Sequence, residues 1–227
     1  MQQFALFSTT HIYTLIGYFI FFCLLFLFCS FAQKKKKIAR IIAILILGLK
    51  FSELWYRHTV LGAEIRTLLP LHLCNVTLVV TILAMLFQAK FLFQLVFFWS
   101  VGAIFALLTP EVREPFPSFL GISFFITHFY LLFAVAYEMV FFKFRPTKAG
   151  LIGSFITLNL IALGVYFINA KLGTNYFYIN FKPTFNSPLD FFGPWPNYIL
   201  IVDGIYLFLS MFMYWLFREK TYKLSIR

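Results

Sequence analysis

The sequence predicts an all-α polytopic membrane protein with seven transmembrane helices, and three observations lead to this fold class. Of the 227 residues, 62% are hydrophobic and 12% are charged, whereas soluble domains are about half apolar and about a quarter charged. The mean hydropathy is +0.88. The apolar stretches are continuous runs near the roughly 20 residues that a spanning helix needs, and they do not alternate as barrel strands do.

Seven apolar runs follow one another along the chain with short connections. Each has 18 to 24 residues, which at about 1.5 Å per residue is enough to cross a hydrocarbon core of about 30 Å. No basic residue precedes the first run, unlike in a cleavable signal peptide, so we expect it to be a true span. The predicted spans are 12–32, 38–56, 70–87, 91–108, 119–142, 149–169 and 198–217.

Basic residues predict the orientation of these spans. Of the 19 Lys and Arg residues, 13 fall on one side, five on the other, and Lys50 lies inside a span. The positive-inside rule then gives an outside N-terminus and a cytoplasmic C-terminus. The same distribution argues against nucleic-acid binding, because no basic face alternates with exposed aromatics. The 13 residues are Lys34, Lys35, Lys36, Lys37, Arg40, Lys90, Lys143, Arg145, Lys148, Arg218, Lys220, Lys223 and Arg227, and the five are Arg57, Arg66, Arg113, Lys171 and Lys182.

The chain forms one transmembrane domain over 1–227, with one long outer segment at 170–197. This segment contains four prolines and many aromatics, so we expect an ordered lid over the outer mouth of the bundle. An interfacial aromatic belt joined to a stiff linker is the alternative. The predicted lid residues are Asn175, Tyr176, Lys182, Asp190, Trp195 and Tyr198.

Polar residues inside the spans gather at the outer half and the centre of the membrane. Because such residues are costly in lipid and usually face the protein interior, they predict one polar pocket. Simpler interpretations stay open: Lys50 and Glu53 neutralise each other, Asn159 forms an interhelical hydrogen bond, and Asp203 forms a pair near the interface. The pocket residues are Lys50, Glu53, His72, Cys74, Asn75, His128, Asn159 and Asp203.

Three other polar residues are expected to be structural. Glu138 lies near the inner end of its span, where it would pair with Lys143 or extend toward the interface. His11 and His58 lie at the outer interface and are expected to be solvated.

One cysteine differs from the other two. Cys23 and Cys29 lie among Phe and Leu and are expected to pack as small apolar residues, without a disulfide. Cys74 lies in the first turns of a helix opened by Pro70, where the helix dipole favours a thiolate. His72, two residues earlier, points about 200° away on an ideal helix. His128, the other histidine embedded in a span, is therefore the expected partner of Cys74.

Four segments carry a resemblance to a known family: LPLHLC at 69–74, THFY around His128, GTNY at 173–176 and KPTFNSPLDFFGPWPNY at 182–198. Over essentially the whole chain, the sequence resembles the YwaF-like bacterial integral membrane proteins. That family is similar to a eukaryotic transmembrane acyltransferase family implicated in remodelling ether phospholipids. The resemblance implies a bacterial cytoplasmic membrane location and a catalytic pair of Cys74 and His128.

The function that this resemblance implies is lipid acyl transfer through a thioester on Cys74, with His128 as the base. The expected partners are a phospholipid acyl donor and a lysolipid acceptor, and no cofactor or metal is expected. His72 or Asn75 could donate to an oxyanion, and Glu53 or Asp203 could orient a histidine. A lipid hydrolase with the same pair, and a small-solute transporter or receptor with an outward polar pocket, are the alternatives.

Overall fold

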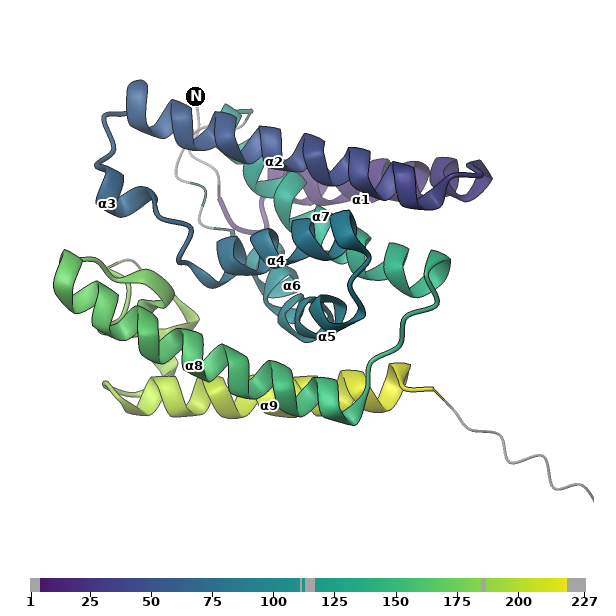
Figure 1. Cartoon of the computed structure of the whole chain (residues 1–227). Helices are drawn as coiled ribbons and strands as arrows, with labels where there is room; N and C mark the ends of the chain where they lie inside the picture. Colours follow the sequence, from purple (N-terminus) through teal and green to yellow (C-terminus); the bar gives the residue numbers. More distant parts are fainter. Residues whose placement is uncertain (1–4, 111, 113–116, 185–186, 220–227) are drawn as a thin grey trace, which may run out of the picture.

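The computed structural model describes residues 5–110, 112, 117–184 and 187–219, which are mainly helical and contain no strand (Figure 1). Arg113, Lys220, Lys223 and Arg227, which contribute to the predicted orientation, lie outside these residues, as does part of the predicted lid at 185–186. The helices are α1 (Thr9–Phe31), α2 (Lys35–Thr59), α3 (Ile65–Leu68), α4 (Leu73–Phe87), α5 (Lys90–Trp99), α6 (Val101–Leu108), α7 (Phe119–Phe141), α8 (Lys148–Leu172), η1 (Tyr176–Tyr178), η2 (Pro188–Phe192) and α9 (Asn197–Phe217).

The predicted spans coincide with helices, but within the described residues five helical stretches are long and apolar enough to cross a membrane. These five are Thr9–Phe31, Lys90–Leu108, Phe119–Phe141, Lys148–Leu172 and Asn197–Phe217. The helix α4 is short, because the chain before Leu73 is extended at His72 and the helix ends at Phe87. Its 15 residues extend over about 22 Å, less than a hydrocarbon core. The helix α2 is long, but it carries Arg40, Lys50 and Glu53 along its apolar part.

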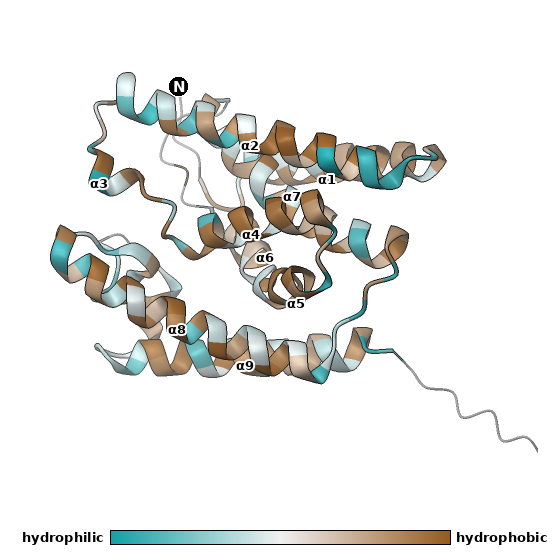
Figure 2. Cartoon of the chain, in the orientation of Figure 1, coloured by the Kyte–Doolittle hydropathy of each residue, from teal (hydrophilic) through white to brown (hydrophobic). Residues whose placement is uncertain are grey.

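The helices are arranged around a central group formed by α4 to α7 (Figure 1). The helices α1 and α2 pack on α7 from one side, and α8 packs on α5 from the opposite side with α9 beside it. In the apolar windows of α5–α6 and of α7, 61% of the residues are buried, against 17% for α1 and α8 and 6% for α9. The outer helices therefore present the apolar surface seen along them in Figure 2, as an integral membrane protein requires.

Contacts between helix ends show which ends lie together. At one end, Lys35 Nζ donates to the carbonyl of Cys29, Tyr137 Oη donates to the carbonyl of Lys35, and Arg40 Nε donates to the carbonyl of Leu86. The end of α1, the start of α2 and the ends of α4 and α7 therefore meet here. At the other end, Ser123 at the start of α7 contacts Glu53 near the end of α2. We call the first the lysine-rich end and the second the opposite end.

Candidate functional site

A charged cluster on α2 lies at the centre of the candidate site. The Glu53 carboxylate is 5% exposed and accepts from Lys50 Nζ at 3.0 Å, Arg57 Nε at 2.9 Å and Ser123 Oγ at 2.7 Å. Lys50 and Arg57 lie three and four residues from Glu53, which places all three on one helix face. The predicted neutralisation of Lys50 by Glu53 is therefore observed, and Ser123 joins the cluster to α7.

Cys74 occupies the first turn of α4 and is a free, half-buried thiol. The first backbone bond of the helix runs from Val76 N to the carbonyl of His72, so the N–H groups of Cys74 and Asn75 precede the hydrogen-bonded ladder. The His72 side chain, at the N-cap, makes no capping bond. The start of α4 thus places backbone donors that precede the hydrogen-bonded ladder beside the Cys74 thiol.

His128 is 5% exposed on α7, and its ring orientation is fixed by its own helix. Nδ1 lies 2.7 Å from the carbonyl oxygen of Phe124, and the ring packs on the Phe124 ring at 4.1 Å between centroids. A carbonyl oxygen can only accept, so Nδ1 carries the proton. In the neutral imidazole, Nε2 is then the nitrogen with a lone pair, which is the state a general base requires.

The helices α2, α4 and α7 pack against one another, and this brings four of the predicted pocket residues into one region. The charges of Lys50 and Glu53 act on both Cys74 and His128. The Phe124 carbonyl supplies the contact that orients His128 at Nδ1, while the Glu53 carboxylate accepts from Lys50, Arg57 and Ser123. The role of Glu53 as an orienting group for a histidine stays a prediction.

Asn159 and Asp203 form a separate polar contact between α8 and α9. Asn159 Nδ2 donates to Asp203 Oδ1 at 3.2 Å and to the carbonyl of Phe155 at 3.1 Å. The interhelical hydrogen bond predicted for Asn159 is therefore present. Asp203 thus contacts α8 through Asn159, and its role as an orienting group for a histidine stays a prediction.

The described part of the outer segment 170–197 docks on the chain that leads into α4. Tyr176 is 2% exposed, and its hydroxyl donates to the carbonyl of Arg66 at 2.7 Å. Arg66 Nη1 donates in turn to the carbonyl of Leu172 at 3.1 Å. The His72 ring lies 5.0 Å from the Tyr176 ring and 5.5 Å from the Tyr178 ring. Burial raises the pKa of the Tyr176 phenol further above neutral pH. The segment therefore contacts the residues immediately before Cys74.

The remaining predicted lid residues hold the outer segment together. Asn175 Nδ2 donates to the carbonyl of Phe181 at 2.7 Å, and Trp195 Nε1 donates to the carbonyl of Ile179 at 3.0 Å. Tyr198 Oη donates to the carbonyl of Tyr178 at 2.5 Å. Asp190 and Lys182 also meet within the segment, through Lys182 Nζ and the Asp190 carbonyl, while the Asp190 carboxylate caps η2 at Ser187.

Two residues expected to be structural occupy environments different from the prediction. His11 is fully buried and not solvated, since Nδ1 accepts from Phe7 N at 3.0 Å and Nε2 donates to the carbonyl of Leu107 at 3.0 Å. Glu138 neither pairs with Lys143 nor extends to the interface. It is fully buried, and within the described part of the chain neither of its carboxylate oxygens has a hydrogen-bond partner.

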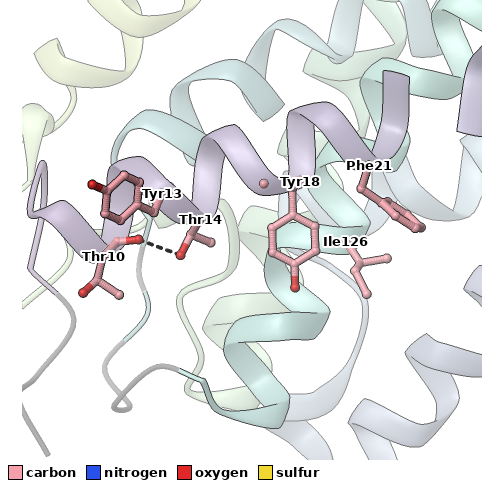
Figure 3. Close-up of a pocket in the computed structure, with 7 residues that line it drawn as sticks. Thr10, Tyr13, Thr14, Tyr18, Phe21 and Ile126 are labelled. Atoms are coloured by element: carbon pink, nitrogen blue, oxygen red, sulfur yellow. Dashed lines mark hydrogen bonds between the residues drawn. The ribbon is translucent and has the colours of Figure 1, made fainter. Parts of the chain in front are cut away.

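A groove of about 640 Å³ runs along the outer side of α1 and α7 (Figure 3). It is lined by Thr10, Tyr13, Thr14, Gly17, Tyr18, Phe21 and Ile126, and Thr14 donates its hydroxyl proton back to the carbonyl of Thr10. None of the predicted site residues lines it. The groove is therefore an apolar surface feature separate from Cys74 and His128.

A comparison with protein families identifies the chain. The model of the TMEM164 family matches residues 6–214. The chain belongs to the TMEM164 family. An uncharacterized protein of Treponema pallidum (strain Nichols) is 29% identical to this TMEM164 family member over 122 residues, which are 54% of this chain and 51% of the relative. The chain thus spans about half the length of the curated relative it matches. No solved structure matches it.

Sequence reasoning missed three groups at or near the candidate site of this TMEM164 family member. Ser123 was missed because a serine in a span gives no distinctive signal, although its position five residues before His128 places it in the same span. The Phe124 carbonyl was missed because any residue has one. Asn169 is buried, accepts from Tyr176 N at 2.8 Å and donates to the carbonyl of Tyr176 at 2.9 Å. Among the described residues, no group of three His, Cys, Asp or Glu side chains could hold a metal.

Proposed function

We propose that this membrane protein is a cysteine-dependent acyltransferase acting on phospholipid or another membrane lipid. One observation carries the proposal: α4, with a thiol in its first turn, packs on α7, which carries a buried imidazole whose Nδ1 faces the Phe124 carbonyl and whose Nε2 therefore has the lone pair. The thiol is Cys74 and the imidazole is His128. The packing of α4 on α7 supports their action as a pair.

In the first half of the proposed reaction, Cys74 Sγ attacks the carbonyl carbon of a lipid acyl ester while His128 Nε2 accepts the thiol proton. The ester C–O bond breaks, and Nε2 returns the proton to the leaving alkoxide. A lysolipid departs, and the acyl group stays on Cys74 as a thioester. The backbone N–H groups at the start of α4, including that of Asn75, are suited to stabilise the oxyanion that forms in between.

In the second half, a hydroxyl of another lipid attacks the thioester carbonyl and gives its proton to His128 Nε2. The C–S bond breaks, and the departing thiolate takes up the proton, which restores the free thiol. The net result is the transfer of an acyl group from one lipid hydroxyl to another. Water as the acceptor in this step would make the same pair a hydrolase.

We propose further that the outer segment 170–197 is a lid on this site, and its contacts with Arg66 and His72 support this role. By excluding water, the lid would protect the thioester from hydrolysis and so favour a lipid acceptor. We retain seven spans with an outside N-terminus in a bacterial cytoplasmic membrane as part of the proposal. Cysteine labelling that placed the Lys34–Lys37 region outside would contradict this orientation.

The test is direct capture of the acyl intermediate. The purified protein is incubated with a phospholipid that carries an alkyne-tagged acyl chain, denatured, and assayed for label that neutral hydroxylamine removes. We expect labelling of the wild-type protein and loss of more than about 100-fold in Cys74→Ala and His128→Ala, as removal of a nucleophile or base causes. Addition of a lysolipid should chase the label into a new phospholipid, whereas release as free fatty acid would identify a hydrolase.

Two control variants make this experiment specific. Cys23→Ala removes an exposed cysteine and Cys29→Ala a buried one, both from α1, and both should keep the label. Labelling that persists in Cys74→Ala, or that disappears equally in Cys29→Ala, would overturn the proposed role of Cys74. Absence of any acyl label, together with a gradual response of small-solute binding to substitutions in the pocket, would favour the transporter or receptor alternative.

A further inference from the structure

A polar hollow of about 230 Å³, separate from the apolar groove, lies at the other end of the helices from Cys74. Cys74 is in the first turn of α4, whereas the hollow includes Lys90, just beyond the last turn of the same helix. Its volume is several times the roughly 30 Å³ share of one water molecule. The hollow, which we call the basic hollow, is lined by Lys90, Lys143, Arg145, Pro146, Thr147, Lys148, Tyr214, Arg218 and Glu219.

The walls of the basic hollow are held by a buried glutamine. Gln94, on α5, is 6% exposed, and its Nε2 donates to the carbonyl of Arg145 at 2.9 Å. Its Oε1 accepts from Thr147 N at 2.9 Å. The segment between α7 and α8 is thus fixed against α5. Arg145 Nη1 donates to the carbonyls of Met139 and Phe144, which fixes the guanidinium as well.

The charge of the basic hollow is strongly unbalanced. Five of its residues are cationic (Lys90, Lys143, Arg145, Lys148 and Arg218) and one, Glu219, is anionic, so the formal charge of the lining is five minus one, or +4. In the described part of the chain, the ion pairs involve Glu53 and Glu64, and none includes a cation of the hollow. Such a concentration of positive charge without carboxylate partners favours a bound anion.

The surroundings of the basic hollow match the headgroup region of a bilayer. It lies where α5 and α8 begin and α9 ends, and all three helices have apolar, membrane-spanning character. Large aromatic side chains flank these helix ends: Phe91 is 68% exposed, Trp215 is 59% exposed and Phe217 is 44% exposed. Aromatic residues of this kind are typical of the membrane interface, and basic pockets between membrane helices bind anionic headgroups there.

From this geometry we propose that the basic hollow binds the phosphate group of an anionic phospholipid headgroup. The positive-inside rule accounts for basic residues at this end but not for their convergence, since Lys36 and Lys37 serve the same rule and do not line the hollow. Residues from three separate parts of the chain meet here: Lys90, the 143–148 segment and the 214–219 segment at the end of α9. The site is independent of the Cys74 chemistry proposed above.

The test titrates the full-length protein in neutral detergent with short-chain phosphatidylglycerol and reads binding by native mass spectrometry and by thermal shift. Phosphatidylcholine with the same chains and inorganic phosphate serve as the other probes. Each basic residue near an anionic lipid surface contributes about fivefold in affinity. We therefore expect the Lys143→Gln, Lys148→Gln double variant to bind phosphatidylglycerol about 25-fold more weakly than the wild type.

The matched control is Lys36→Gln, Lys37→Gln, which removes two exposed lysines from the same end of the molecule but outside the hollow. We expect it to weaken binding less than about threefold. If the two double variants weaken phosphatidylglycerol binding equally, the binding comes from diffuse charge attraction, and the proposed site is wrong. Equal protection by phosphatidylcholine or by inorganic phosphate would overturn the assignment to an anionic lipid. If the Lys143, Lys148 variant does not fold, Arg218→Gln should show the fivefold loss, and unchanged binding in it would contradict the proposal.

Discussion

Replacement of Glu53 by Gln is expected to destabilise the helical bundle by about 3 kcal/mol. The Glu53 side chain is 7% exposed and its partner Lys50 is 15% exposed, so this is a buried ion pair. Loss of one partner from a buried pair costs about 3 to 5 kcal/mol, because the other charge stays buried without compensation. Arg57 is 41% exposed, so its pairing with Glu53 contributes little to stability, and the introduced glutamine side chain could still accept from Ser123. We therefore expect a loss at the low end of this range.

Thermal unfolding in detergent, followed by tryptophan fluorescence, measures this cost. For a chain of about this size, 1 kcal/mol corresponds to roughly 2 to 4 °C, so Tm should fall by about 6 to 12 °C in Glu53→Gln. Arg57→Gln is the matched control and should lower Tm by less than about 4 °C, since exposed pairs contribute about 1 kcal/mol or less.

A double variant separates charge burial from loss of shape. Lys50→Met with Glu53→Leu removes both charges and should recover most of the stability lost in Glu53→Gln, because an apolar pair avoids the desolvation of two ions. A Tm within 2 °C of the wild type for Glu53→Gln, or a double variant no more stable than the single one, would refute the reasoning.

Three further substitutions test other parts of the fold, with thermal unfolding as the measurement in each. Glu138→Leu should raise the free energy of unfolding by about 1 to 3 kcal/mol, since both carboxylate oxygens are buried without hydrogen-bond partners among the described residues. A lower Tm in this variant would contradict that reasoning. Gly150→Ala should lower the free energy of unfolding by about 1 to 3 kcal/mol, because the added Cβ would lie 2.0 Å from Oε1 of the fixed Gln94 side chain. An unchanged Tm would mean that the Gln94 side chain moves freely. Asn169→Ala should lower the free energy of unfolding by about 2 kcal/mol and make the segment around Tyr176 accessible to added protease. If this segment stays protected from the protease, Asn169 is not its anchor.

The sequence predicted the helices well because long apolar runs have few other stable structures in a membrane. The predicted spans agree with the helix ends to within a few residues, and 119–142 differs from α7 by one residue. The start of α4 was predicted less well, since Pro70 opens an extended segment and the helix begins at Leu73. The interruption at Ser100, between α5 and α6, carries no proline or glycine at that position and could not be predicted from composition.

Side-chain partners were predictable where they lie on one helix and less so across helices. Lys50 and Glu53 are three residues apart, so their pairing follows from helix geometry. Glu138 and Lys143 are five residues apart, but α7 ends at Phe141 and Lys143 adopts a φ of 60°. Lys143 therefore lines the basic hollow and does not pair with Glu138. The burial of His11 depends on the Leu107 carbonyl at the end of α6, 96 residues later in the chain. Contacts of that separation are set by packing, which local patterns do not encode.

The charges around Cys74 bear on the proposed chemistry in a way that the Cys–His pair alone does not. Lys50 and Arg57 flank a single carboxylate, Glu53, so the α2 cluster has a formal charge of +1. The backbone N–H groups at the start of α4 add a partial positive charge near the Cys74 sulfur. In the proposed reaction these groups would favour negative charge on a thiolate or on the oxyanion of a tetrahedral intermediate, whereas burial of the thiol opposes it. Because a carbonyl and not a carboxylate orients His128, no additional negative charge opposes this effect from the side of the base. In the proposed reaction, the backbone donors at the start of α4 would therefore offset part of the cost of forming an anion at a buried thiol.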